Sequence, residues 1–176
     1  MKRWLGVTVL SSLLLAGCGE AEQALQSVYT ANDAYEHTME QVVVTMDHYE
    51  VQRINEPTDE QQALNIAAGS YIVEAALHVT NTGNTAVYYT PDVFLQIGDK
   101  QFVNETARLV GEGSNQSVEI LSEQDKSFVV SFLIPAAVYE DAEQAMMQIP
   151  VPYTQPHTTS SGDALGDNGF WEIALK

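Results

Sequence analysis

The chain has 176 residues, 45% of them hydrophobic, with a single cysteine and a formal net charge of −17 at pH 7. This length is enough for one domain with a substantial core, and a lone cysteine excludes a disulfide within the chain. The excess of acidic side chains repels phosphate groups, so the composition excludes nucleic acid as a partner.

Residues 1–17 have the features of a signal peptide. Lys2 and Arg3 precede an apolar run over residues 4–16, which is shorter than the roughly 20 residues that a membrane span needs. The run ends in Leu15-Ala16-Gly17-Cys18, which resembles the lipobox of bacterial lipoproteins. This resemblance implies cleavage before Cys18 and a covalent, palmitate-bearing lipid on its thiol. The alternative is an ordinary signal peptide that a cysteine follows by chance.

Residues 18–39 are predicted to be a flexible tether, because they are rich in Ala, Glu, Gln, Ser and Asn and lack a sustained apolar face. The lipid would then hold a domain formed by residues 40–176 on the outer face of the bacterial cytoplasmic membrane. Cleavage removes Lys2 and Arg3, so five basic residues remain against 24 acidic ones and the net charge becomes −19. No cofactor is expected besides the covalent lipid on Cys18.

The domain is predicted to consist of short strands separated by turn signals. In the clearest strand, Tyr71–Thr80, apolar residues alternate with mostly polar ones, which is the period of a half-buried strand. A short helical stretch is expected within residues 61–68. Eight segments have strand character: Val42–Ile54, Tyr71–Thr80, Val87–Thr90, Val93–Ile97, Gln101–Val103, Ser127–Ile134, Met146–Val151 and Gly169–Leu175.

Seven or eight strands without sustained helical periodicity predict an all-β fold, an immunoglobulin-like antiparallel β-sandwich. Residues 108–124 and 152–168 are expected to be loops. The last strand is expected to be anchored in the core by Phe170 or Trp171.

Three segments of the domain also resemble a known group of secreted Gram-positive proteins. They are the strand and turn over residues 69–83, the hairpin start Phe94-Leu95-Gln96-Ile97-Gly98, and the late strand end Phe132-Leu133-Ile134-Pro135. Together they resemble the domain-of-unknown-function 4352 group over about residues 40–175. The resemblance implies a telokin-like, immunoglobulin-like fold that often follows a lipobox, and it carries over no catalytic residue.

Two His/Met pairs are the candidate metal ligands. His37 with Met39, and Met46 with His48, are alternate residues, which share a face of a regular strand. Thioether and imidazole groups suit copper(I), so an extracytoplasmic copper-binding function is one alternative. The other interpretation places Met46 in the core, His48 on the surface and His37 in the tether. The odd spacing between the two pairs also splits them between the faces of a continuous strand.

Other candidate sites have weaker patterns. The stretch 163–169 with Glu172 loosely resembles a calcium loop without the EF-hand spacing, and Glu140, Asp141 and Glu143 form an acidic cluster. Ordinary solvated turns explain both patterns. His78 is expected on the outer face of its strand, beside Glu74.

Catalytic motifs are absent from the sequence, which has no Gly-x-Ser-x-Gly elbow, no His-Glu-x-x-His and no phosphate-binding loop. We therefore expect a lipid-anchored, non-enzymatic module that binds an unidentified protein or small molecule. Residues 104–117 and 152–168 are expected to be its contact loops. A small cell-surface hydrolase is the remaining alternative.

Overall fold

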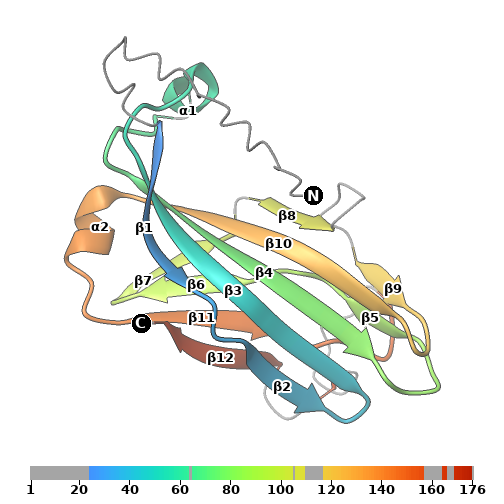
Figure 1. Ribbon diagram of the computed structural model, residues 1–176. Coiled ribbons are helices and arrows are strands. Elements are labelled where there is room, and N and C mark those ends of the chain that lie inside the picture. The colour runs from blue at the N-terminus through green and yellow to red at the C-terminus, as the bar shows by residue number, and fades with distance from the viewer. Residues whose placement is uncertain are drawn as a thin grey trace, which may run out of the picture.

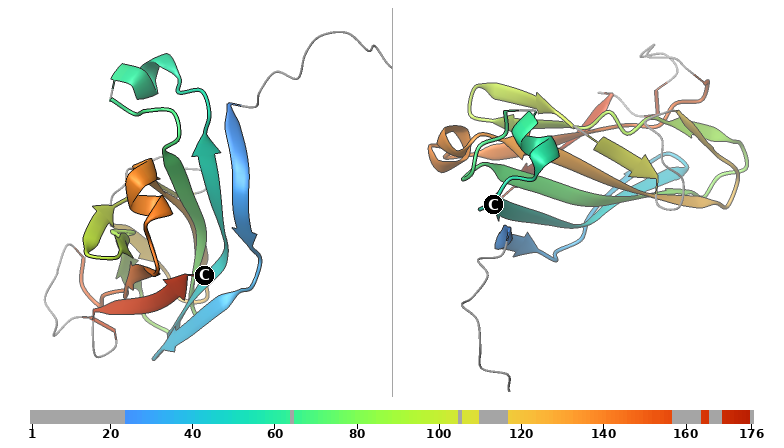
Figure 2. Two further views of the ribbon diagram at one scale, coloured as in Figure 1. Left: turned by 90° about the vertical axis from the view of Figure 1, so that its left-hand side faces the viewer. Right: turned by 90° about the horizontal axis from the view of Figure 1, so that it is seen from above.

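The computed structural model describes residues 24–63, 65–104, 106–109, 117–156, 164–165 and 169–175. Every strand pairing in this part of the chain is antiparallel, and two sheets pack face to face as a β-sandwich (Figure 1). Figure 2 shows the two sheets from the side as separate layers. The predicted β-sandwich is confirmed.

The larger sheet has six strands in the order β1-β3-β4-β10-β8, with β2 also paired to β3. β1 and β2 follow one another along the same edge of β3, because β1 pairs with its second half and β2 with its first half. The strands are β1 (Leu25–Ala31), β2 (Tyr35–Met39), β3 (Val42–Ile54), β4 (Tyr71–Asn81), β8 (Thr106–Leu109) and β10 (Asp125–Ile134).

The smaller sheet has the order β12-β11-β6-β7, and a separate two-stranded sheet pairs β5 with β9. The hairpin predicted around residues 98–100 is confirmed as β6–β7. These strands are β5 (Val87–Tyr89), β6 (Phe94–Ile97), β7 (Lys100–Val103), β9 (Val118–Ile120), β11 (Ala145–Pro150) and β12 (Phe170–Leu175).

The core lies between the sheets and follows the alternation read from the sequence. The predicted inward set of β4 is buried: Tyr71, Val73, Ala75, Leu77 and Val79. In β10 the alternate residues from Phe128 to Ile134 are buried in the same way. Burying each large apolar side chain stabilises the fold by about 1.5–3 kcal/mol, so this double row is the principal source of cohesion in a domain without disulfides.

A β-bulge interrupts β3 where its inward side chains change parity. The register with β4 passes from Met46↔Leu77 directly to His48↔Ala76, which leaves Asp47 without a partner residue on β4. Val44 and Met46 are buried before the bulge, and Tyr49 is buried after it. The extra residue lets positions of opposite parity face the same core.

The prediction of a flexible tether is wrong for residues 25–31 and 35–39, which form β1 and β2. The sequence conceals these strands because they lie at a sheet edge, where backbone hydrogen bonds suffice and few side chains are buried. In β1 only Ala31 is buried. Residues 1–23, and with them the predicted signal peptide and Cys18, lie outside the described residues.

Other differences are local. β8 and β9 lie in or beside segments expected to be loops, so the described residues contain twelve strands rather than seven or eight. The short helices are α1 (Asp59–Ala63), which overlaps the stretch expected to be helical only at residues 61–63, and α2 (Ala136–Glu140), which was not predicted. Ile173, rather than Phe170 or Trp171, is the buried residue of β12. No helix in the described part of the chain is long and apolar enough to cross a membrane.

Candidate functional site

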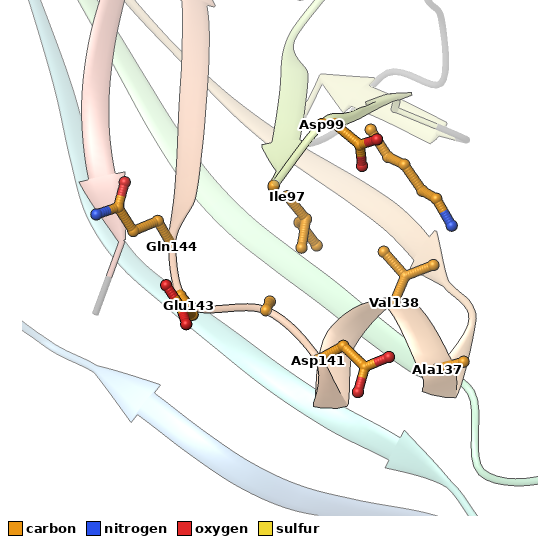
Figure 3. A pocket seen from close by; sticks show the side chains of 10 residues that line it. Ile97, Asp99, Ala137, Val138, Asp141, Glu143 and Gln144 are labelled. Carbon is orange, nitrogen blue, oxygen red and sulfur yellow. The ribbon is translucent and has the colours of Figure 1, made fainter.

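A cavity of about 510 Å³ opens at one end of the sandwich, between the β6–β7 turn and the segment that runs from α2 to β11. We call it the end pocket. Ile97 and Val138 extend into the space between these two walls (Figure 3). Ten residues line it: Ile97, Gly98, Asp99, Lys100, Ala137, Val138, Asp141, Ala142, Glu143 and Gln144.

A backbone hydrogen bond next to the β6–β11 ladder joins the two walls of the end pocket. Gly98 has a φ of +58°, which a glycine adopts without steric cost, and this conformation forms the tight turn between β6 and β7. The Gly98 N–H donates to the carbonyl oxygen of Gln144 at 3.3 Å. The turn is thereby held against the start of β11.

The other wall is held by α2, which packs on the start of β4. The Tyr139 ring stacks on the Tyr71 ring with centroids 4.2 Å apart, and the Tyr71 hydroxyl donates to Glu140 Oε1 at 3.1 Å. Burial, and then the hydrogen bond to Glu140, raise the pKa of the Tyr71 hydroxyl above its usual value. Burial likewise raises the pKa of Tyr139. Both phenols are therefore neutral at physiological pH and act as fixed packing elements.

The lining combines an apolar floor with a charged rim. Ile97 is buried, and Val138 and Ala142 are half-buried, whereas Asp99, Lys100, Asp141 and Glu143 are exposed. Three carboxylates and one ammonium give the rim a net negative charge. A neighbouring cavity of about 400 Å³ shares Gly98, Glu143 and Gln144 and is otherwise lined largely by Met146, Ala174 and Leu175. The arrangement suits a ligand that has an apolar body and a positively charged group.

Sequence reasoning named Asp141 and Glu143 only as a solvated cluster and missed the end pocket. The pocket brings together residues 97–100 and 137–144, which are distant in the sequence. The β11–β6 pairing, in which Ala145 lies opposite Ile97, brings these segments side by side. No pattern within either segment indicates that pairing.

A second constellation, also missed, lies on the outer face of the larger sheet. His78 Nδ1 is 2.8 Å from Ser127 Oγ, and His78 Nε2 is 3.5 Å from Asp125 Oδ2. His78 is on the outer face, as predicted. These are the residue types of a nucleophilic triad, but the His78 and Asp125 side chains are 34% and 61% exposed. Neither described cavity includes any of the three residues.

The four candidate copper ligands are segregated between core and surface. Met39 and Met46 are buried in the core, whereas His37 and His48 are exposed. The bulge at Asp47 explains the second pair, because it places Met46 and His48 on opposite faces despite their spacing of two. The His37 ring stacks on Trp171 of β12, with centroids 5.4 Å apart. This placement gives no support to a shared copper site.

The remaining candidates divide between visible and undescribed regions. Glu172 accepts a hydrogen bond from Gln148 Nε2 at 3.0 Å, while most of the loose calcium loop lies outside the described residues. Much of the two expected contact loops also lies outside them. Across the described ranges, no group of three or more His, Cys, Asp or Glu side chains could hold a metal ion.

Comparison with known proteins places the chain in a family without an assigned activity. Residues 19–176 match the model of a family described as a domain of unknown function (DUF5068). No curated protein matches the sequence. The matching family is not the 4352 group that the sequence resembles, so that likeness stays a resemblance.

Solved structures share the fold at low sequence identity. A functionally unknown protein from Listeria monocytogenes EGD-e has a TM-score of 0.61 at 12% identity, over 85% of each chain. A "putative lipoprotein (ycdA)" from Bacillus subtilis has a TM-score of 0.50 at 11% identity, over 80% of this chain and 38% of that one. An uncharacterised β-sandwich protein from Clostridium difficile 630 has a TM-score of 0.46 at 9% identity, over 81% of this chain and 90% of that one. At these identities the likeness concerns the fold alone.

Proposed function

The chain belongs to the DUF5068 family, and from this premise we propose that it is a lipid-anchored extracytoplasmic protein that binds a ligand without catalysing a reaction. The anchor is supported by the Leu15-Ala16-Gly17-Cys18 sequence behind a basic and apolar start. The family match begins at residue 19, directly after Cys18. The Bacillus subtilis structure of similar fold, described as that of a "putative lipoprotein", adds support of the same kind.

The end pocket is the observation that carries the binding role. It has the volume of a small-molecule site and combines apolar side chains with a few charged groups at the rim. Its walls are fixed by the stacking of Tyr71 on Tyr139 and by the backbone contact between Gly98 and Gln144. We therefore propose that the ligand is a small molecule with an apolar body and a cationic group.

A titration followed by NMR tests this proposal. The mature chain, labelled with 15N, would be titrated with phenethylammonium and separately with the neutral 2-phenylethanol. We expect phenethylammonium to shift the amide signals of Gly98, Val138 and Ala142, and the neutral compound to bind more weakly. Asp141→Asn removes one rim charge and is expected to weaken binding about two- to five-fold, because an exposed charge contributes at most about 1 kcal/mol.

Glu36→Gln is the matched control. It removes an exposed carboxylate from β2, outside the end pocket, and should leave the affinity unchanged. Shifts confined to other regions, or an equal response to the neutral compound, would show that the end pocket is not the binding site.

We propose a non-enzymatic role because neither cavity formed by the described residues includes a member of the Ser127–His78–Asp125 constellation. His78 and Ser127 lie directly opposite one another on paired strands. Backbone N–H groups of paired strands lie in the plane of the sheet, so they do not point toward a substrate above the Ser127 hydroxyl as oxyanion donors would. Covalent labelling of Ser127 by a fluorophosphonate, lost in Ser127→Ala, would contradict this part of the proposal.

A further inference from the structure

The chain enters the domain at a fixed point, six residues after Cys18. The carbonyl oxygen of Ala24 accepts hydrogen bonds from the backbone N–H groups of Asn55, at 2.9 Å, and Glu56, at 3.3 Å. Leu25 then pairs with Ile54. Six residues reach about 20 Å at full extension, whereas a tether up to residue 39 would have reached about three times as far.

The entry point lies at the same end of the sandwich as both helices. Residues 55–70, which include α1, begin with the two residues that bond to Ala24. They end next to Tyr71, on which α2 packs. Figure 1 shows α1, α2 and the start of β1 together at the left of the view. The end pocket opens here too, because α2 forms one of its walls. We call this the proximal end.

The opposite end is formed by three turns, which we call the turn cluster: residues 40–41, 81–86 and 121–124. The Thr82 N–H donates to the Gln41 carbonyl at 2.8 Å, and Ser122 Oγ donates to the Gly83 carbonyl at 2.6 Å. Asn81 Nδ2 donates to the carbonyls of Thr85 and Ile120, at 2.7 and 3.0 Å. Since β4 runs from Tyr71 to Asn81, the two ends are roughly 35 Å apart along the strand.

Charge acts against contact between the proximal end and lipid head groups. Residues 55–70 contain three acidic residues and no Lys or Arg. Anionic lipids repel such a surface, with a range of about 8 Å at physiological ionic strength. The short segment between Cys18 and Ala24 therefore sets an upper limit on the distance between this surface and the membrane. Electrostatic repulsion keeps the surface from adhering to the head groups.

We propose that the proximal end faces the membrane across a gap of no more than about 20 Å, so that the end pocket opens toward the head groups and the turn cluster points away. This inference rests on the proposed anchor at Cys18, and it adds an orientation that the anchor alone does not fix. A ligand of the end pocket would be exchanged at the membrane surface.

Energy transfer to the membrane tests the orientation. In the lipidated chain the Cys18 thiol is blocked, so an introduced cysteine is the sole free thiol for a donor dye. Ala63→Cys in α1 and Ala137→Cys in α2 would be compared with Asn84→Cys in the turn cluster; all three positions are exposed. The labelled chains would be reconstituted in vesicles of phosphatidylcholine and phosphatidylglycerol with a head-group acceptor dye.

We expect strong transfer from residues 63 and 137 and several-fold weaker transfer from residue 84. Inserting twelve Gly/Ser residues between Gly19 and Glu20 raises the average reach of the linker from about 13 Å to about 23 Å, and should lower transfer from residue 63. Chains that fail to float with the vesicles would show that the anchor is wrong, and the inference falls with it. Chains that float but give equal transfer from all three positions, or stronger transfer from residue 84, would overturn the orientation alone.

Discussion

The Tyr89 side chain places a polar hydroxyl group in the hydrophobic core. Tyr89 is fully buried, and its ring lies 5.1 Å from that of Phe128, but its oxygen has no hydrogen-bond partner among the described residues. A buried hydroxyl without a partner destabilises the folded state by about 1–3 kcal/mol. Burial, with a smaller contribution from Asp92, also raises the pKa of this phenol far above its usual value.

Tyr89→Phe is therefore expected to stabilise the domain by about 1–3 kcal/mol in denaturant unfolding at pH 7. The substitution should also change how the free energy of unfolding depends on pH in alkaline solution. In the unfolded chain the phenol ionises near pH 10, whereas in the folded chain it stays neutral, so the unfolded state gains stability as the pH rises. The wild-type free energy of unfolding should fall by an extra ~1.4 kcal/mol per pH unit above pH 10 relative to Tyr89→Phe.

Tyr88→Phe is the matched control for Tyr89→Phe. The Tyr88 hydroxyl lies on the surface and donates to Glu119 Oε1 at 3.0 Å, so its loss should change stability little. Tyr89→Phe could instead be destabilising, or its free energy of unfolding could fall above pH 10 as steeply as that of the wild type. Either result would show that the Tyr89 hydroxyl has a hydrogen-bond partner in the folded protein.

At the scale of elements, the bulge in β3 makes a prediction that distinguishes two single-residue deletions. Deleting Asp47 would restore continuous alternation, with Val44, Met46 and Tyr49 all on the core face. We expect the fold to persist with a loss below about 2 kcal/mol. Deleting Thr45 would instead turn Met46 outward and Asp47 inward, at a cost of about 2–5 kcal/mol for the lost core side chain alone. Urea unfolding of the two variants decides, and equal losses would contradict the parity argument.

Sequence patterning located the three longest strands most closely. β4 and β10 alternate along the sequence, β3 is rich in β-branched residues, and their expected bounds agree with the structure to within two residues. β1 and β2 escaped notice because an edge strand is held by backbone bonds that leave no side-chain period. α2 has five residues and no buried side chain, so it has no periodic pattern either.

The candidate site was predictable only in its parts. The acidic residues Asp141 and Glu143 are visible in the sequence, but their proximity to Ile97 depends on the pairing of β11 with β6. The His37–Trp171 stack and the His78–Ser127 contact likewise join distant strands. Cross-strand neighbours are set by register, which a single sequence does not specify.

At the scale of the whole molecule, a disulfide-free acidic domain begins two strands earlier than its hydrophobic pattern indicates. The consequence is a spacer of five residues, 19–23, between Cys18 and Ala24 in place of a tether of about twenty. The proposed anchor and the proposed orientation both require that Cys18 is the attachment point.

Mass spectrometry of the mature N-terminal peptide, from protein purified out of bacterial membranes, tests that requirement most directly. We expect a peptide that starts at Cys18 and carries a lipid on its sulfur, and we expect the Cys18→Ser chain to lack both the lipid and the cleavage. A free thiol at Cys18, or a mature chain that starts elsewhere, would contradict the account.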